Sequence, residues 1–230
     1  MIGLIGAMTV EVELIKGSMT EKREETISGI TFVQGKLEGV DCVAAVSGIG
    51  KVNAALCAQI LASVYKVDVL INTGIAGSLD ARIDIGDMVI STDALYHDMD
   101  AVNFGYEPGQ IPQMDIFSFP ADERLIELAK AANEEANPDI HTFTGRIVTG
   151  DQFVSSKEVK ESIVEKFHPL CTEMEGAGIA HAAYLNKISY VIIRAISDKA
   201  DNSATMDYPA FEKQAISHSV RLVKNLLPRI

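Results

Sequence analysis

Four carboxylates of the chain could perform acid–base chemistry. Glu11 comes just after the first apolar run, Glu173 and Glu175 stand two residues apart, and Asp198 follows a strongly apolar run. Cleavage of an N-glycosidic bond needs a proton for the departing base, and negative charge near a ribosyl group that becomes oxocarbenium-like. Carboxyl groups can serve both needs.

Asp198 could act as the acid only in a suitable environment. An aspartic acid at its reference pKa of about 3.9 is a poor proton donor near neutrality, so burial or neighbouring carboxylates must raise the pKa of this group. Glu11, Glu173 and Glu175 would supply such neighbours if the fold brings them together. In an extended chain Glu173 and Glu175 point to the same side, with Met174 opposite.

Each acid also has a structural interpretation. Glu11 could be a solvated residue on a first helical turn, and Glu173 and Glu175 could open a helix whose dipole favours acids. Arg194, four residues before Asp198, could form a structural ion pair with it. The spacing alone leaves these alternatives open.

Two glycine-rich segments follow predicted strands and could border a ligand. Gly48-Ile49-Gly50-Lys51 opens a predicted helix, where free backbone N–H groups can face an anion or a sugar hydroxyl. Asn53 stands where a dinucleotide fingerprint needs its third glycine, and the segment also lacks the residues of a P-loop. Residues 72–78 form a second expected turn, whose small residues let a flat ligand lie against the backbone.

An alternation of strands and helices must position these groups. Short apolar runs predict strands at residues 2–5, 40–46, 67–71, 88–91, 146–149 and 189–196. Helical patterns are found at residues 51–65, 121–136, 156–167, 176–185 and 208–227. Buried strands that alternate with helices imply an α/β fold, with a mixed sheet inside an α/β sandwich. With 230 residues and 47% hydrophobic content, we expect a single domain over residues 1–230.

Two stretches depart from this alternation. Residues 21–38 are more polar and predict a hairpin-like excursion, with strands near residues 30–33 and 36–37. Residues 99–119 have weak periodicity, several glycines and prolines, and aromatic residues that include Phe104 and Tyr106. A long loop of this kind usually has a functional or interface role, and its aromatic side chains should be covered by the domain or by a second subunit.

Composition narrows the partners and the compartment. A net charge of −12 argues against nucleic acid and anionic membranes, so a small molecule is the expected partner. Cys42, Cys57 and Cys171 are odd in number and far apart, which indicates neither a disulfide framework nor a zinc site. No apolar run approaches the roughly 18 residues of a spanning helix, and the first residues do not form a signal peptide. We therefore expect a cytoplasmic protein.

A series of short blocks, in family order over nearly the whole chain, resembles the methylthioadenosine/S-adenosylhomocysteine nucleosidases. The blocks are Gly6-Ala7-Met8 with Glu11, Ser47-Gly48-Ile49-Gly50-Lys51, Asn72-Thr73-Gly74 with Ala76-Gly77, Tyr96-His97-Asp98, Phe104-Gly105-Tyr106, Gly150-Asp151, Glu173-Met174-Glu175 and Arg194-Ala195-Ile196-Ser197-Asp198. Each block alone is weak evidence for this family, whereas the whole set is highly specific for it. The resemblance implies the nucleoside phosphorylase-like fold, a three-layer α/β/α sandwich with a central mixed sheet, usually as a homodimer. It also implies an adenine nucleoside and water as reactants, with no cofactor and no metal.

The resemblance assigns roles to the catalytic residues. Asp198 would be the general acid that protonates adenine N7, with Ser197 orienting it. Glu11, assisted by Glu175 and Arg194, would position and activate the attacking water. Glu175 would also bind the ribose hydroxyls.

The resemblance assigns further residues to substrate binding. Met174 would pack on the sugar, Phe153 would stack on adenine, and the backbone of Val154 would read the edge of the base by hydrogen-bond direction. The other expected contacts are Ile49, Ala76, Gly77, Glu173 and Tyr208. Three residues match the loop that reaches across the dimer to cover the alkylthio pocket of the partner, namely Phe104, Tyr106 and Pro112.

The chain departs from the family pattern at two positions. Tyr208 falls where phenylalanine is usual, which keeps an aromatic wall. Ile75 stands where a small serine is common, which removes a possible polar contact near the ribose or the water. His97 lies in a matching block without an obvious proton to move, so we interpret it as structural.

Several other functions are weighed against hydrolysis. A nucleoside phosphorylase of the same fold needs a cationic phosphate cradle, whereas the first loop carries Glu11 and has no basic residue before Lys16. A nucleosidase for another adenine nucleoside, such as aminofutalosine, stays open. A non-catalytic nucleoside sensor is disfavoured because binding alone needs no matched acid and base. A dinucleotide-dependent dehydrogenase is disfavoured by the failed fingerprint.

Overall fold

The computed structural model describes residues 1–201 and 203–230, except for the side chains of residues 205–207 and 209. The strands of the described chain are β1 (Ile2–Gly6), β2 (Thr20–Ile27), β3 (Ile30–Leu37), β4 (Val40–Val46), β5 (Val69–Ser78), β6 (Met88–Tyr96), β7 (Phe119–Pro120), β8 (Thr142–Thr149), β9 (Cys171–Glu173) and β10 (Ser189–Asp198). Its α-helices are α1 (Thr9–Ser18), α2 (Lys51–Ser63), α3 (Glu123–Ala136), α4 (Lys157–Phe167), α5 (Gly176–Asn186) and α6 (Ala204–Leu226).

The strands form one mixed sheet, part of which closes on itself. β1 runs parallel to β4 and β5, and β10 runs parallel to β5. β3 and β2 extend the sheet beyond β4 as an antiparallel hairpin. On the other side the order continues as β10, β6, β8 and β9, and β5 pairs with both β10 and β9. This part of the sheet is therefore a closed ring of strands.

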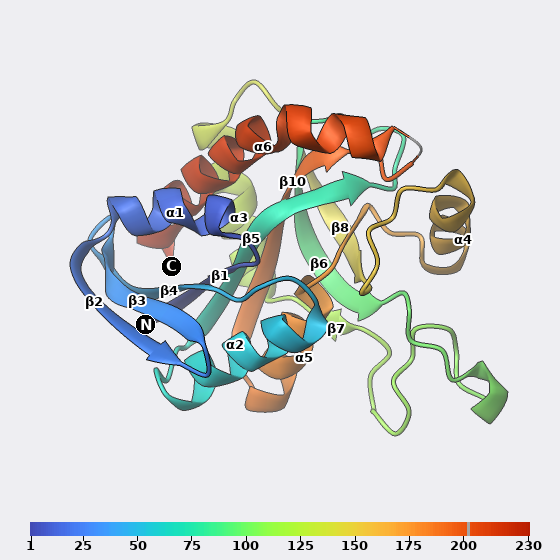
Figure 1. The fold of residues 1–230 in the computed structure, drawn as a ribbon, viewed down its shortest axis with the longest axis horizontal. Helices are drawn as coiled ribbons and strands as arrows, with labels where there is room; N and C mark the ends of the chain where they lie inside the picture. The colour runs from blue at the N-terminus through green and yellow to red at the C-terminus, as the bar shows by residue number, and fades with distance from the viewer. Residues whose placement is uncertain (202) are drawn as a thin grey trace.

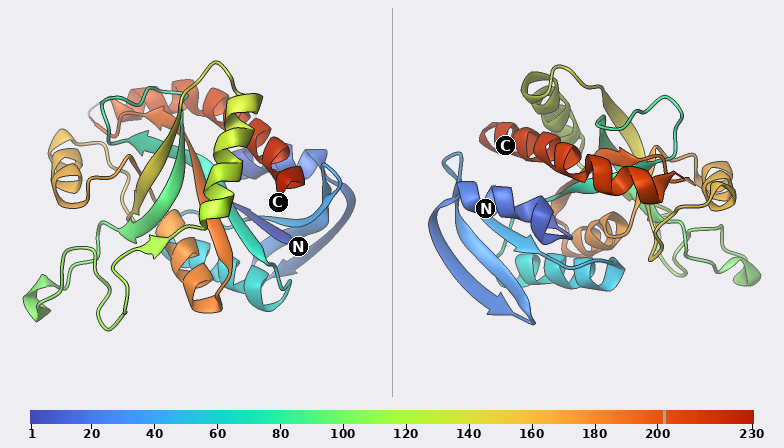
Figure 2. Two further views of the ribbon diagram at one scale, coloured as in Figure 1. Left: turned by 180° about the vertical axis from the view of Figure 1, so that it is seen from behind. Right: turned by 45° about the horizontal axis from the view of Figure 1, so that its top comes forward.

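Helices cover both faces of the sheet. α1, α3 and α6 lie on one face, where α6 packs against both α1 and α3, and α2 and α5 lie together on the other face (Figures 1 and 2). α4 stands apart at one side of the molecule (Figure 1). This arrangement confirms the predicted three-layer α/β/α sandwich with a central mixed sheet.

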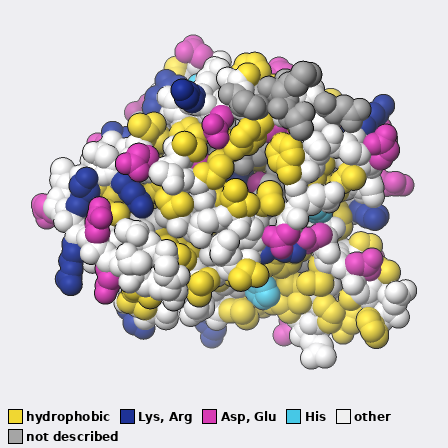
Figure 3. Space-filling model, in the orientation of Figure 1, with side chains coloured by type: hydrophobic (Ala, Val, Ile, Leu, Met, Phe, Trp, Pro, Cys, Tyr) yellow, Lys and Arg dark blue, Asp and Glu magenta, His cyan; other side chains and the backbone are white. Residues whose placement is uncertain are grey.

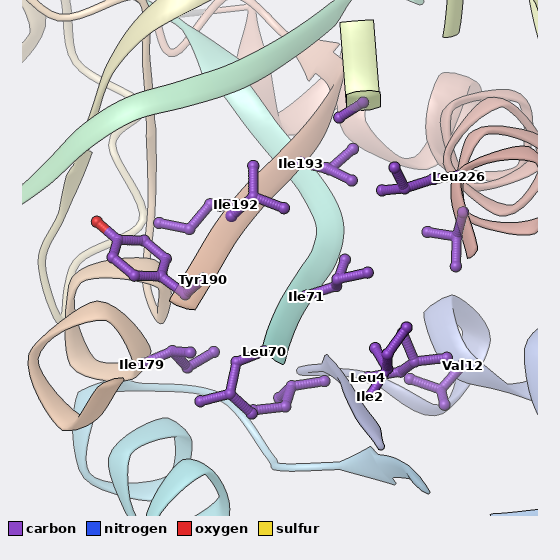
Figure 4. Packing of buried hydrophobic residues seen from close by; sticks show 14 of the residues in the cluster. Ile2, Leu4, Val12, Leu70, Ile71, Ile179, Tyr190, Ile192, Ile193 and Leu226 are labelled. Atoms are coloured by element: carbon purple, nitrogen blue, oxygen red, sulfur yellow. The ribbon is translucent and has the colours of Figure 1, made fainter. Parts of the chain in front are cut away.

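The main core follows from strands that are apolar on both faces. Leu70 and Ile71 of β5, together with Ile192 and Ile193 of β10, are fully buried between the two helical layers (Figure 4). Such near-continuous aliphatic runs are typical of parallel strands covered on both sides.

A second, smaller core lies under α4, and we name it the α4 cluster. Its buried members come from distant parts of the chain, and they are Leu79, Leu95, Val148, Val154, Ile163, Phe167 and Ala200. Ser156 caps the helix, because its hydroxyl accepts a hydrogen bond from the backbone N–H of Val159 at 3.4 Å. The α4 cluster thus joins the end of β5, the segment after β8 and the segment after β10.

Residues 72–78 are not a turn, so the prediction for this segment was wrong. They continue β5 and pair with β10 in parallel register. A Cβ at Gly74 would lie 2.7 Å from Glu11 Oε1, and a Cβ at Gly77 would lie 2.7 Å from Asp198 Oδ1. These glycines therefore allow two carboxylates to contact the strand, and they do not serve to turn the chain.

Other differences concern where elements begin and end. The predicted strand at 40–46 matches β4, whereas β6, β8 and β10 are longer than predicted. The helix α1 and the short strands β7 and β9 were not predicted, and the polar segment forms a full hairpin of β2 and β3. α6 begins at Ala204, four residues before the predicted start at Tyr208. No helix in residues 1–201 or 203–230 is both long enough and apolar enough to cross a membrane.

Candidate active site

A cavity of about 400 Å³ lies where β5 and β10 end, between the starts of α1 and α5 and the segment after β8. Its lining residues are Ala7, Met8, Glu11, Ile49, Ile75, Ala76, Gly77, Gln152, Phe153, Val154, Thr172, Glu173, Met174, Glu175, Ser197, Asp198 and Tyr208. The size and the mostly apolar walls suit a small-molecule ligand. All four carboxylates singled out from the sequence line this cavity.

Glu11 is fixed by backbone donors at the start of α1. Its Oε2 accepts hydrogen bonds from the N–H groups of Ala7 at 2.7 Å and Met8 at 2.9 Å, and its Oε1 accepts one from Ile75 at 3.3 Å. The side chain is buried, and this burial raises the pKa of the Glu11 carboxyl. Glu11 is therefore held rigidly and is a better proton acceptor than a solvated glutamate.

Glu175 comes just before the first residue of α5 and contacts the first glycine-rich segment. Its Oε1 accepts a hydrogen bond from the N–H of Gly50 at 2.9 Å, and Gly50 has a φ of 97°, which favours glycine. Burial, and then the neighbouring Glu173 carboxylate, raise the pKa of Glu175 to about 7. The glycine-rich segment that was expected to border a ligand thus positions a buried acid.

Glu173 is the counterion of a buried arginine. Its carboxylate accepts hydrogen bonds from the Arg194 guanidinium, from the Thr149 hydroxyl, and from the N–H groups of Glu175 at 3.1 Å and Gly176 at 2.7 Å. Arg194 is 1% exposed and also donates to Asn72 Oδ1 at 2.5 Å. Because these donors already bind its carboxylate, Glu173 has a structural role: it connects Arg194 of β10, Thr149 of β8 and the start of α5.

Glu11, Glu173, Glu175 and Arg194 form what we name the acidic cluster. It combines three buried carboxyl groups with one guanidinium, so a ligand that gains positive charge inside the cavity would be stabilised. One expectation is corrected here. Met174 does not point away from its neighbours, because Glu175 leaves the extended conformation with a ψ of −41° and all three residues line the cavity. Arg194 is not among the lining residues.

Asp198 lies at the end of β10 beside Gly77 of β5. The register of the two strands shifts between Ile196 and Asp198, which is a bulge that re-aims the carboxyl group. The Ser197 hydroxyl lies 2.9 Å from Asp198 Oδ2, and the N–H of Ala200 donates to Oδ1 at 2.8 Å. Both donors favour the carboxylate that remains once a proton has left.

Aromatic and apolar groups stand next to Asp198. Phe153 and Tyr208 meet edge to face, with ring centroids 6.0 Å apart, and Val154 is buried in the α4 cluster. The Tyr208 hydroxyl donates to Glu212 Oε1 at 3.1 Å. We name Phe153, Val154, Ser197, Asp198 and Tyr208 the base wall, since they line the same cavity and offer aromatic rings and one acid to a ligand.

The prediction missed part of the lining. Ala7, Met8, Gln152 and Thr172 line the cavity, and each stands within a few residues of an expected contact, which was the available signal. Ile75 was noted only as a departure, yet it lines the cavity and donates to Glu11.

The three residues assigned to a partner subunit do not line this cavity. Phe104, Tyr106 and Pro112 lie in the long loop between β6 and β7, and Phe104 is 83% exposed. The loop extends away from the body of the molecule (Figure 1), and hydrophobic side chains gather in the same lower right region of Figure 3. Tyr106 and Pro112 are half-buried.

His97 also lies outside the cavity lining. Its ring packs against Gly150, where a Cβ would be 2.3 Å from Nε2, and burial lowers the pKa of the imidazole. It therefore tends to stay neutral. Within the described residues, no group of three or more His, Cys, Asp or Glu side chains is placed to hold a metal ion.

Comparisons with known proteins identify relatives along the full length. The family model described as the Phosphorylase superfamily matches residues 1–228. The 5′-methylthioadenosine/S-adenosylhomocysteine nucleosidase of Staphylococcus carnosus (strain TM300) is 40% identical over 228 residues, which are 99% of each chain.

Solved structures with the same fold include the following two enzymes. The 5′-methylthioadenosine/S-adenosylhomocysteine nucleosidase of Colwellia psychrerythraea 34H, in complex with adenine, has a TM-score of 0.95 and 39% identity, covering 99% of this chain and 94% of that one. The futalosine hydrolase of Helicobacter pylori strain 26695 has a TM-score of 0.93 and 31% identity, covering 100% of this chain and 97% of that one.

Proposed function

The chain belongs to the 5′-methylthioadenosine/S-adenosylhomocysteine nucleosidases of the phosphorylase superfamily, and we propose that it hydrolyses the N-glycosidic bond of 5′-methylthioadenosine and S-adenosylhomocysteine. The products are adenine and the 5-thio-substituted ribose. One observation carries this proposal: a single cavity is lined by Glu11, Glu175 and Asp198, and none of its described lining residues is a lysine, arginine or histidine.

Asp198 donates the proton to the base. The proton passes to adenine N7 while the electron pair of the glycosidic bond moves to N9, so adenine leaves as a neutral molecule. Ser197 holds the carboxyl group, Phe153 stacks on the purine, and the backbone of Val154 reads its edge. This division of labour is supported by the position of Asp198 beside an aromatic and apolar wall.

The acidic cluster acts on the sugar. Glu11 positions the water and accepts its proton, and Glu175 binds the ribose hydroxyls. Glu173 and Arg194 act indirectly. Arg194 is buried behind the lining, donates a hydrogen bond to Glu173, and stabilises the ionised form of the carboxylates around it. The net negative charge of the cluster stabilises the oxocarbenium-like ribosyl group. Ile49, Met174, Ala76, Gly77 and Tyr208 complete the contacts.

Water is a better nucleophile for this site than phosphate. Phosphorolysis needs cationic groups that hold a phosphate anion. The described lining contains only acids as charged groups, and Arg194 is already paired with Glu173. A phosphate dianion beside Glu11 and Glu175 would be repelled, so the site favours hydrolysis.

The active form is proposed to be a homodimer of single-domain subunits that span residues 1–230. Val52 and Leu56 of α2 are exposed, as is Phe104 of the long loop, and exposed apolar side chains of this size are suited to a subunit interface. Phe104, Tyr106 and Pro112 would cover the alkylthio end of the partner's cavity. Sedimentation of the purified protein would test this state, and a monomer at assay concentration would contradict it.

We further propose a cytoplasmic location and a role in methionine salvage. Free cysteines that are all buried fit a reducing compartment. The salvage role follows from the substrate alone, since methylthioribose retains the sulfur of methionine.

The similarity to a futalosine hydrolase favours a second candidate substrate, an aminofutalosine-type adenine nucleoside. The base wall would serve both substrates, because they differ at the 5′ substituent and share adenine.

The test is release of free base from a panel of nucleosides. Methylthioadenosine and S-adenosylhomocysteine should release adenine, whereas methylthioinosine should react much more slowly because its 6-oxo group reverses the hydrogen-bond direction at the base edge. Release from aminofutalosine alone would favour the second candidate. Absence of release from every adenine nucleoside, despite binding, would overturn the enzyme proposal.

A further inference from the structure

Lys160 lies on α4, outside the cavity lining, and reaches the two strand ends beside the proposed acid. Its Nζ donates to the carbonyl of Ser78 at 3.0 Å and to the carbonyl of Lys199 at 2.5 Å. Ser78 directly follows Gly77, and Lys199 directly follows Asp198. The Lys160 ammonium group thus links the residue that follows Gly77 to the residue that follows Asp198. Gly77 and Asp198 are themselves paired between β5 and β10.

This bridge is placed where the strand pairing becomes irregular. The β5–β10 register shifts just before Asp198, and the pairing of the two strands ends at Asp198 and Gly77. A hydrogen bond from a charged donor is stronger than one from a neutral donor. The Lys160 bridge therefore continues the link between the two strands one residue beyond their last pair.

α4 also connects this bridge to the recognition of the base. Val154 of the base wall and Ala200, whose N–H donates to Asp198, are both buried in the α4 cluster with Ile163 of the helix. Lys160 lies one helical turn before Ile163. The helix therefore supports both elements that would touch adenine.

We propose that Lys160 is a positioning residue for Asp198: its ammonium group fixes the two strand ends that place the carboxyl group, and its charge stabilises the carboxylate formed when the proton moves to the base. This role rests on the proposed function.

The charges around Lys160 and Asp198 are compatible with this role. Asp201, Lys199 and Asp198 face Lys160, and Lys199 itself is directed to the carbonyl of Ile83 at 2.5 Å and to Asp84 at 3.2 Å. Burial lowers the pKa of Lys160, while the two acids and the two carbonyl acceptors favour its ammonium form. Cys171 and Tyr208 also face Asp198, and burial raises the pKa of both, so they stay neutral near pH 7.

The experiment compares pH profiles of adenine release for Lys160→Met, Lys160→Arg and the control Lys166→Met. Lys166 is an exposed lysine on the same helix, about 9 Å further along its axis. For Lys160→Met we expect kcat to fall roughly tenfold because the acid is less well placed. The alkaline limb of the pH profile of adenine release should move up by roughly half a pH unit, because removing a nearby cation makes Asp198 a weaker acid. Lys160→Arg should restore both, and Lys166→Met should change neither.

A purely structural lysine would behave differently. An unchanged limb and kcat in Lys160→Met, or a lower unfolding temperature with no shift of the limb, would overturn the role. If Lys160→Met unfolds below the assay temperature, Lys160→Gln is tested with the same expectations. Failure of the wild type to release adenine would overturn the proposed function, whereas an active wild type with an unaffected variant would overturn the role of Lys160 alone.

Discussion

The acidic cluster and the base wall share one cavity but are built in different ways. Glu11, Glu173 and Glu175 are held by backbone N–H groups and by one arginine that is fully enclosed in the sandwich. Asp198 and Val154, in contrast, are supported by the α4 cluster at the side of the molecule. The carboxylates of the acidic cluster are fixed by backbone N–H groups at the starts of α1, α2 and α5, whereas the groups that recognise the base rest on a separate support. Substitutions on the two sides should therefore have different consequences.

The largest effect is expected on the base wall, which carries a single acid. Asp198→Asn keeps the shape but supplies no useful proton, so kcat should fall roughly a thousandfold, within the range that general acids contribute. Adenine affinity, measured by calorimetry, should be largely retained. Asp139→Asn, a matched change at an exposed position outside the cavity lining, should stay active. Near-normal turnover by Asp198→Asn would show that Asp198 is not the general acid.

In the acidic cluster, Glu11→Gln should lower kcat roughly a hundredfold, because an amide accepts no proton from water. The loss should be smaller than for Asp198→Asn, since the remaining carboxylates still stabilise the cationic sugar. Adenine release under saturating substrate measures this effect. Glu13→Gln, on the exposed side of α1, is the control. Equal activity of Glu11→Gln and the wild type would exclude Glu11 from the mechanism.

Phe153→Ala sharpens the comparison through binding. Loss of aromatic stacking should weaken adenine affinity roughly tenfold, since stacking of a base on a side chain contributes about 1–3 kcal/mol. Phe153→Tyr keeps the ring and should bind normally. Titration calorimetry with adenine distinguishes the two variants, and unchanged affinity in Phe153→Ala would place the base elsewhere.

The smallest effect concerns stability and the acidic cluster. The pKa of Glu175 is raised from 4.5 to about 7 in the folded protein, so the folded state holds this proton more tightly than the unfolded chain. The stability from this group is therefore present below pH 4.5 and is lost as the pH rises to about 7. Glu175→Gln removes this loss, so its unfolding temperature should exceed that of the wild type by a few degrees at pH 8 and by less at pH 5. A constant difference across this range would contradict the assigned pKa.

The sequence predicts the acids of the cavity better than the strand contacts that position them. Glu11 and Asp198 could be found because each follows an apolar run, which is a local pattern, whereas Glu175 was found by its spacing from Glu173 and by the family resemblance. Most strands and the helices α2 to α6 were predicted from local patterns of apolar residues, whereas α1 was not. The glycines at 74 and 77 were misread as turn signals, because their neighbours Glu11 and Asp198 are distant in sequence.

Contacts between remote segments could not be predicted. The closed ring needs β5 to pair with both β9 and β10, and no local periodicity encodes two partners. The α4 cluster joins Leu79, Val154 and Ala200, and the bridge of Lys160 depends on a register shift. Such features appear only when the strands are assembled.

The central claim is that water, activated by the acidic cluster, attacks the sugar. It is tested most directly by following adenine release from methylthioadenosine in buffers with and without phosphate, and by identifying the sugar product by mass spectrometry. We predict equal rates in both buffers and free methylthioribose as the product. A strict requirement for phosphate, with methylthioribose 1-phosphate as the product, would contradict the account.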